Sequence, residues 1–153
     1  MKIRSLTINS RAEVIVKIVR EILTLFKVEI VGRAGEADYA QLSVVNRQSG
    51  CEPPSVMTEV FLFANDGACE KYAFSADGKA DEVPRAAVHR IVKRNVYEFF
   101  RTRFVLSPAP WGILHGVRPT KIVHRWLRSG MSPGAIVRRL QEDYDCSAGK
   151  ARL

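Results

Sequence analysis

The spacing of apolar residues changes twice along this chain, and these changes limit the folds that it can adopt. Residues 13–26 repeat their apolar side chains at helical spacing. Residues 38–46 and 55–64 instead alternate, as strands with one buried face do. Residues 81–104 return to helical spacing. This order predicts a run of strands that lies between two helices in the sequence.

Shorter signals supply the remaining elements. Residues 2–8 and 28–32 predict two more strands, and Asn65-Asp66-Gly67 is a strong hairpin signal followed by a returning strand at 69–75. Ser10 and Glu13 have the spacing of a capping box at the start of the first helix. The order β-α-β-β-β-β-α predicts an α+β fold, with an antiparallel sheet covered by two helices.

Pro108 and Pro110 interrupt every regular pattern, so we expect a boundary here between residues 1–106 and 107–153. The second part predicts a short helical hairpin, with Pro119 in the first turn of one helix and Ser132 capping the next. Gly130 suits the end of the first of these helices. Ser147 begins a third helix only six residues before the last residue, and we expect the chain to be a truncated piece of a longer protein.

Basic and acidic side chains are divided unevenly. Residues 1–84 hold 10 basic and 12 acidic side chains, whereas residues 85–153 hold 14 basic and 4 acidic ones. This asymmetry indicates that the second half faces an anion. That anion is either a separate ligand or an acidic surface elsewhere in the same protein, and both readings stay open.

Composition excludes several classes of protein. The chain is 46% hydrophobic, which is too high for disorder, and its most apolar early stretch, 12–31, is broken by charges and lacks a cleavage site. Its three cysteines are odd in number and widely spaced, unlike those of a disulfide scaffold. We therefore expect a soluble protein of the reducing cytoplasm with no membrane partner.

Common catalytic and metal-binding motifs are absent. The sequence has no GxSxG, HExxH, P-loop or GxGxxG motif, and no CxxC or CxxxCxxC group. We expect His89 on the exposed side of its helix, and Cys51 and Cys69 as small buried thiols beside strands. No catalytic residue and no metal ligand is predicted.

Residues 110–125, PWGILHGVRPTKIVHR, form the one dense group of candidate binding residues. Glycines at 112 and 116 allow sharp turns or a close approach of the backbone. Arg118 and Lys121 flank a helix start, where free amides favour an anion; the alternative is that Arg118 pairs with an acidic residue of the same protein. The candidate contacts with an anion or with another domain are Arg118, Lys121, His124, Trp111 and Gly116. For Trp111, a packing role is the alternative to stacking.

The two predicted helices 119–129 and 133–144 also have the outline of a helix-turn-helix. Arginines at 125, 128, 138 and 139 surround the turn, and arginines of this kind contact phosphates. A small basic nucleic-acid-binding module is therefore the alternative function. A protein-interaction domain without a ligand is a third reading.

Residues 111–153 carry the pattern WGIL-x-G-[IV]-RPTK, then an aliphatic pair, a His, Gly-Met-Ser, a charged helix and Asp-Tyr. This pattern resembles the segment that precedes the catalytic barrel in one branch of the oxygen-independent coproporphyrinogen III oxidases. These are the coproporphyrinogen dehydrogenases of the radical S-adenosylmethionine superfamily. Where that pattern has Thr after WGIL, this chain has His115, so no hydroxyl role is carried over to this position.

The resemblance implies an N-terminal accessory domain of an oxidoreductase of haem biosynthesis. In such enzymes a CxxxCxxC motif binds a [4Fe-4S] cluster, and S-adenosylmethionine bound to it yields the radical that starts the oxidative decarboxylation of propionates to vinyl groups. This chain lacks the motif, so we expect no cofactor in it and no activity of the chain alone. The implied partners are the catalytic barrel of the same polypeptide and an anionic tetrapyrrole, with Arg118 and Lys121 as candidate contacts.

Overall fold

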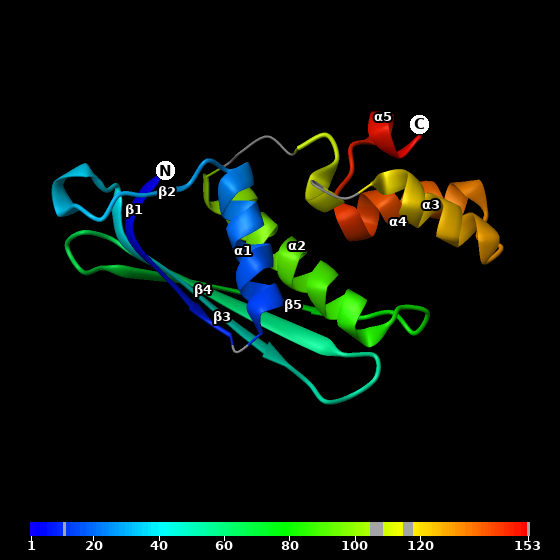
Figure 1. Cartoon of the computed structure of the whole chain (residues 1–153), viewed down its shortest axis with the longest axis horizontal. Helices are drawn as coiled ribbons and strands as arrows, with labels where there is room; N and C mark the ends of the chain where they lie inside the picture. Colours follow the sequence, from blue (N-terminus) through cyan, green and yellow to red (C-terminus); the bar gives the residue numbers. More distant parts are fainter. Residues whose placement is uncertain (11, 105–108, 115–117, 153) are drawn as a thin grey trace. The chain divides into compact units, whose positions relative to one another are not determined.

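The computed structural model describes residues 1–10, 12–104, 109–114 and 118–152. It divides into two compact units, Met1–Arg103 (unit 1) and Phe104–Leu153 (unit 2), whose elements are labelled in Figure 1. Each unit is described by itself.

Unit 1 contains a five-stranded sheet with the strand order β2-β1-β3-β4-β5. Its elements are β1 (Lys2–Asn9), α1 (Glu13–Leu25), β2 (Glu29–Ile30), the 3-10 helix η1 (Ala34–Glu36), β3 (Tyr39–Gln48), β4 (Ser55–Phe63), β5 (Cys69–Asp77) and α2 (Pro84–Phe104). The predicted α+β class with two helices and a following helical hairpin is confirmed. Helix α2 begins three residues later than the sequence pattern predicted.

The sheet is mixed: the antiparallel pairing that the sequence predicted is found among β3, β4 and β5 but not at β1. Strand β1 pairs in parallel with both β2 and β3, whereas β3, β4 and β5 form an antiparallel meander. Helix α1 follows β1 and carries the chain back to the end at which β1 started, so the strands that pair with β1 run in its direction. The predicted hairpin at Asn65-Asp66-Gly67 is confirmed: the Ala64 amide donates to the Ala68 carbonyl over 2.8 Å, and Gly67 has a φ of 94°.

The core of unit 1 lies between one face of the sheet and the two helices (Figure 1). The residues of β4 at positions 56, 58, 60 and 62 share one face of the strand, and this face is buried. Thr58 is the polar member of this face; its hydroxyl donates to Asn46 Oδ1 over 2.7 Å and accepts from Asn95 Nδ2 over 3.0 Å. From the helices, Phe26 packs against Tyr97 and Phe100 with ring centroids 5.3 and 5.1 Å apart.

The start of α1 differs from the predicted capping box. Ala12 occupies the N-cap position, and no side chain caps the helix. Ser10 Oγ instead accepts from the Ala12 amide over 3.3 Å, two residues along the chain. Ser10 therefore stabilises the approach to the helix and leaves the first turn uncapped.

Unit 2 contains the 3-10 helix η2 (Gly112–Leu114) and the helices α3 (Pro119–Arg128), α4 (Pro133–Tyr144) and α5 (Ala148–Ala151). Its start signals are confirmed: Ser132 Oγ accepts from the Ala135 amide, and Ser147 Oγ accepts from the Lys150 amide. Gly130 follows α3 with a φ of 84°. A small apolar core joins these elements; its buried members are Leu114, Ile122, Trp126, Ile136, Leu140, Cys146 and Ala151.

Candidate functional site

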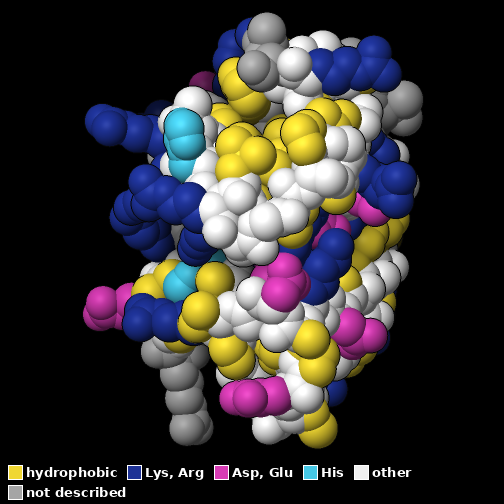
Figure 2. Space-filling model, turned by 90° about the vertical axis from the view of Figure 1, so that its right-hand side faces the viewer, with side chains coloured by type: hydrophobic (Ala, Val, Ile, Leu, Met, Phe, Trp, Pro, Cys, Tyr) yellow, Lys and Arg dark blue, Asp and Glu magenta, His cyan; other side chains and the backbone are white. Residues whose placement is uncertain are grey.

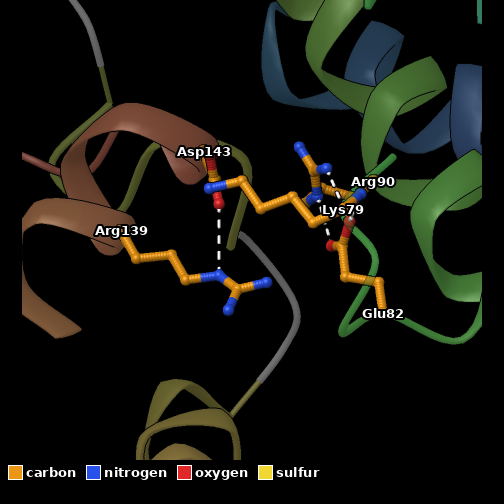
Figure 3. A network of polar contacts seen from close by, with 5 residues as sticks. All are labelled: Lys79, Glu82, Arg90, Arg139 and Asp143. Atoms are coloured by element: carbon orange, nitrogen blue, oxygen red, sulfur yellow. Dashed lines mark hydrogen bonds and ion pairs between the residues drawn. The ribbon is translucent and has the colours of Figure 1, made fainter. Parts of the chain in front are cut away.

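Trp126 is the centre of the α3–α4 hairpin. Its ring is buried, and its centroid lies 5.9 Å from that of Tyr144 and 4.9 Å from the guanidinium carbon of Arg139. Arg139 Nε also lies 3.3 Å from Asp143 Oδ2, one turn along α4 (Figure 3). Because burying a lone guanidinium is costly, the carboxylate and the indole ring together make this buried arginine tolerable. Arg139 therefore serves the hairpin core and is withdrawn from any ligand.

Cations gather along one exposed side of α3, which we call the α3 basic face. Its members are Arg118, Lys121, Arg125 and Arg128. Their spacing of three, four and three residues places them on one side of the helix, and all four are exposed. None of these four side chains makes a hydrogen bond or ion pair within the described residues, and α3 itself contains no acidic residue. Figure 2 shows Lys and Arg side chains gathered at the edges of the part formed by α3 and α4, with hydrophobic side chains between them.

The sequence candidates fall into three groups. Arg118 and Lys121 belong to the α3 basic face, and the alternative pairing of Arg118 with an acidic residue is not found among the described residues. His124 is exposed beside this face. Trp111 is half-buried against the unit 2 core, with Lys150 Nζ 5.3 Å from its ring centroid. Gly116 lies outside the described residues, as does His115.

The apolar residues of α3 are not all buried. The sequence pattern predicts one apolar stripe formed by Ile122, Val123, Trp126 and Leu127, but Leu127 is 46% exposed. The core of this short helix is formed by Ile122 and Trp126, one turn apart, and Leu127 lies well around the helix from both. Leu127 is therefore an exposed leucine on a side of α3 that faces neither the core nor the α3 basic face.

The cysteines do not fit an iron–sulfur cluster. Cys51 and Cys69 are exposed, so the prediction that they are buried was wrong. Cys51 lies in the loop between β3 and β4, and Cys69 is the first residue of β5. Cys146 is buried, its thiol donates to the Trp111 carbonyl over 3.3 Å, and burial followed by the charge of Asp145 raises its pKa to about 11. A thiolate ligand is disfavoured there. Among the described residues, no three His, Cys, Asp or Glu side chains are grouped to hold a metal ion.

Sequence reasoning missed a cleft in unit 1. His89, expected on the exposed side of α2, is half-buried and lines this cleft together with Arg85. The available signal was the spacing of Arg85, Val88 and His89, which places two basic groups around an apolar one on one helix face.

None of the helices in the described part of the chain has the length and apolar content needed to cross a bilayer.

Comparison with curated proteins finds a short similarity. The oxygen-independent coproporphyrinogen-III oxidase-like protein HemZ of Bacillus subtilis (strain 168) is 53% identical to this chain over 34 residues. That stretch is 22% of this chain and 7% of HemZ, so the chain matches only a small part of that relative. No family model matches the chain.

Three solved structures resemble the fold distantly. They are the rare lipoprotein B from Shewanella oneidensis (TM-score 0.45, 12% identity, 69% of this chain and 95% of that one), the PelC dodecamer from Paraburkholderia phytofirmans (0.45, 15%, 62% and 85%) and a minor lipoprotein from Acinetobacter baumannii (0.40, 7%, 68% and 92%). At these scores and identities they indicate no shared function.

Proposed function

We propose that this chain is the N-terminal accessory region of a cytoplasmic coproporphyrinogen dehydrogenase-like oxidoreductase, and that the α3 basic face contacts the carboxylates of an anionic tetrapyrrole. The short similarity to HemZ supports the family. The observation that carries the role is the set of four exposed cations on one face of α3, with no acidic partner among the described residues. A tetrapyrrole with four propionates offers a carboxylate to each of them.

The physical argument rests on repulsion. Lys121 and Arg125 are four residues apart on α3, and Arg125 and Arg128 are three apart. Like charges at these spacings each destabilise a helix by about 0.2–0.5 kcal/mol. Arg118 and Lys121 also lie at the positive end of the helix dipole, where cations are unfavourable. A bound polycarboxylate would offset both the repulsion between the cations and their unfavourable interaction with the helix dipole. Relief of these two unfavourable terms contributes to the free energy of binding.

The role assigned to this chain is to bind and orient, without chemistry of its own. A radical enzyme of the proposed kind needs a [4Fe-4S] cluster, and the residues of this chain do not fit one: two cysteines are exposed in unit 1, and the third is a buried thiol in unit 2. The catalytic barrel of a longer polypeptide would supply the cluster site.

Binding of coproporphyrin III, a stable oxidised relative of the substrate, tests the proposal by fluorescence titration of the 153-residue chain. We expect saturable binding that Lys121→Gln with Arg125→Gln weakens about tenfold, because two charge-assisted contacts are lost. The matched control is Lys17→Gln with Arg20→Gln, which removes the same two charges from the exposed face of α1. Absence of binding, or equal weakening in both double variants, contradicts the proposal.

Docking on the barrel is the alternative role of the α3 basic face. Arg118→Ala in the full-length protein separates the two roles: unchanged tetrapyrrole affinity with a lowered thermal stability of the whole protein indicates docking. Reduced affinity with unchanged stability supports substrate contact.

Nucleic-acid binding is the second candidate, favoured by the same four cations. In a helix-turn-helix the second helix enters the major groove, but among the described side chains of α4 Arg138 is exposed and Arg139 is buried. A mobility-shift assay with duplex DNA decides: phosphate binding falls with salt by a log-log slope of about −0.9 per contact. Lack of any salt-sensitive shift excludes this candidate.

A further inference from the structure

Unit 1 contains a cleft of about 550 Å³, formed where three segments meet. The segments are the start of α1, the start of α2 and the loop between β3 and β4. Its lining residues include Ile15, Pro54, Val88, Arg85 and His89. Small-molecule sites have volumes of about 300–1,000 Å³ and combine apolar walls with a few polar groups, and this cleft has both properties.

Arg85 is distinguished from most cations of its helix. Of the six Lys and Arg residues in α2, four form ion pairs within unit 1: Arg90 with Glu82, Lys93 with Glu21, Arg101 with Glu98 and Arg103 with Glu70. The Arg85 side chain has no hydrogen bond or ion pair among the described residues, and it lines the cleft. His89 lies one turn further on the same helix face. Arg85 and His89 therefore present two basic side chains to the cleft, and neither forms an ion pair among the described residues.

The backbone adds donors on the other side. The first turn of α1 has no side-chain cap, and Ala12, Val14 and Ile15 line the cleft. The Ala12 amide already donates to Ser10 Oγ and the Ile15 amide to the Ala12 carbonyl, so the Val14 amide is the donor that remains for a ligand among these three. Both helices start at the cleft, so the positive ends of two helix dipoles lie there (Figure 1). The amides of an uncapped first turn favour an anion over water.

The cleft continues into a second cavity of about 310 Å³ that shares Ala12, Ile15, Gln48 and Val88 with it. This second cavity reaches Asn46, whose Nδ2 is buried and has no hydrogen-bond partner among the described residues. A buried donor of this kind costs about 1–3 kcal/mol unless an acceptor meets it. Asn46 Nδ2 is not exposed to the cavity, so the groups that face a ligand are Arg85 and His89, which suit acceptor oxygens.

We propose that this cleft binds a small organic anion, with its carboxylate or phosphate group held by Arg85, His89 and the first turn of α1. The apolar part of the ligand packs on Ile15 and Val88. The proposal does not depend on the function proposed above, because it concerns unit 1 and not the α3 basic face.

His89 supplies the readout. Burial, followed by the charge of Arg85, lowers its pKa below the ordinary value, so the imidazole is neutral at pH 7 and donates one N–H. The other ionisable groups that line the cleft are Glu52 and Cys51, both exposed on the β3–β4 loop. A bound anion adds negative charge beside His89 and raises its pKa.

The experiment follows the His89 ring signals of the whole chain by NMR, with His89→Gln identifying them among the three histidines. The probes are inorganic phosphate, phenyl phosphate and benzoate. We expect saturable shifts at His89 with an upward change of its pKa, and at least about tenfold tighter binding of phenyl phosphate than of phosphate, because the ring buries apolar surface. Whichever of phenyl phosphate and benzoate binds more tightly shows whether the cleft prefers a phosphate or a carboxylate group.

Arg85→Gln is expected to weaken the tighter aromatic probe about tenfold, since one charge-assisted contact is lost. Arg20→Gln, on the exposed face of α1 and away from the cleft, is expected to change it less than twofold. Saturation without any shift at His89, absence of saturation, equal effects of the two variants, or equal affinity for phosphate and phenyl phosphate would overturn the proposal. The outcome of the coproporphyrin titration is independent of this experiment, because the residues changed in that titration lie outside the cleft.

Discussion

Gly112 is the residue of unit 2 that tolerates a side chain least. Its φ is 53°, and a Cβ at this position would overlap the Tyr144 carbonyl oxygen and the Asp145 backbone. The sequence predicted a glycine that turns sharply or passes close to other atoms, and this is confirmed for Gly112. The partner could not be predicted, because it lies 32 residues away at the end of α4, beyond the range of any local pattern.

Gly112→Ala is expected to destabilise unit 2 by about 2–3 kcal/mol, because the clash is with backbone and the φ is unfavourable for alanine. Urea unfolding followed by tryptophan fluorescence measures it, since both tryptophans lie in unit 2. Gly134→Ala is the control: no atom lies within 4 Å of its Cβ, and it should stabilise by about 0.5 kcal/mol. Equal stability of the two variants contradicts the close approach.

Glu70 is the carboxylate whose pKa is lowered most strongly among the described residues. Arg103 donates to it from Nε over 2.7 Å and from Nη2 over 2.9 Å, Tyr72 donates over 2.7 Å, and these bonds lower its pKa to about 2. A lowered pKa in the folded state stabilises the fold above the unfolded value near 4.5, and this contribution is lost as the pH falls from 4.5 to about 2.

We expect Arg103→Gln to raise the pKa of Glu70 toward its ordinary value, because the first and largest cause of the shift is removed. The stability difference between variant and wild type should be largest above pH 5 and should vanish near pH 2. Carboxyl NMR titration and urea unfolding at several pH values measure both. Arg101→Gln should leave the Glu70 titration unchanged, and a pH-independent difference for Arg103→Gln would refute the link.

At the scale of elements, the start of α2 depends on a buried ion pair. Arg90 donates to both carboxylate oxygens of Glu82 over 2.7 and 2.9 Å, and the Lys79 amide donates to the same carboxylate over 2.9 Å (Figure 3). The Arg90 and Glu82 side chains are 6% and 11% exposed. This pair fixes the approach to Pro84 and Arg85, and with it one wall of the cleft.

Glu82→Gln is expected to cost about 3 kcal/mol, because it removes the carboxylate charge that both guanidinium contacts of the buried Arg90 face. Glu98→Gln breaks a half-exposed pair with Arg101 on the same helix and should cost less than about 0.5 kcal/mol. Circular dichroism during urea unfolding measures the difference. Similar losses in both variants would show that burial does not strengthen the Arg90–Glu82 pair.

Elements with local signals were predictable, and pairings between distant segments were not. The alternation in β4 and the Asn65-Asp66-Gly67 hairpin depend on neighbouring residues, so the sequence contains them. The parallel pairing of β1 with β3 depends on the path of the chain through α1, for which no local pattern exists. The cleft escaped notice for the same reason, since His89 and Ile15 meet there from different helices.

At the scale of the whole molecule, the two units differ in how far their basic side chains are neutralised by carboxylates. Unit 1 holds 16 basic and 13 acidic residues, and unit 2 holds 8 basic and 3 acidic ones. In unit 1 most cations of α2 are neutralised by carboxylates of the same unit. In unit 2 the cations of α3 have no such partners among the described residues. The net charge of +8 is therefore divided into +3 for unit 1 and +5 for unit 2.

Each unit has its own buried core, and this predicts separate folding. Unit 1 has a complete five-stranded sheet with covering helices, and unit 2 has the small core around Trp126. We expect residues 1–104 expressed alone to keep the amide chemical shifts of the sheet strands, because every strand pairing lies within them. In the whole chain, Gly112→Ala should lower the urea midpoint of tryptophan fluorescence and leave the shifts of β3 and β4 unchanged at the same urea concentration. An unfolded 1–104 fragment, or loss of the sheet signals together with the fluorescence, would mean that the fold of unit 1 requires unit 2.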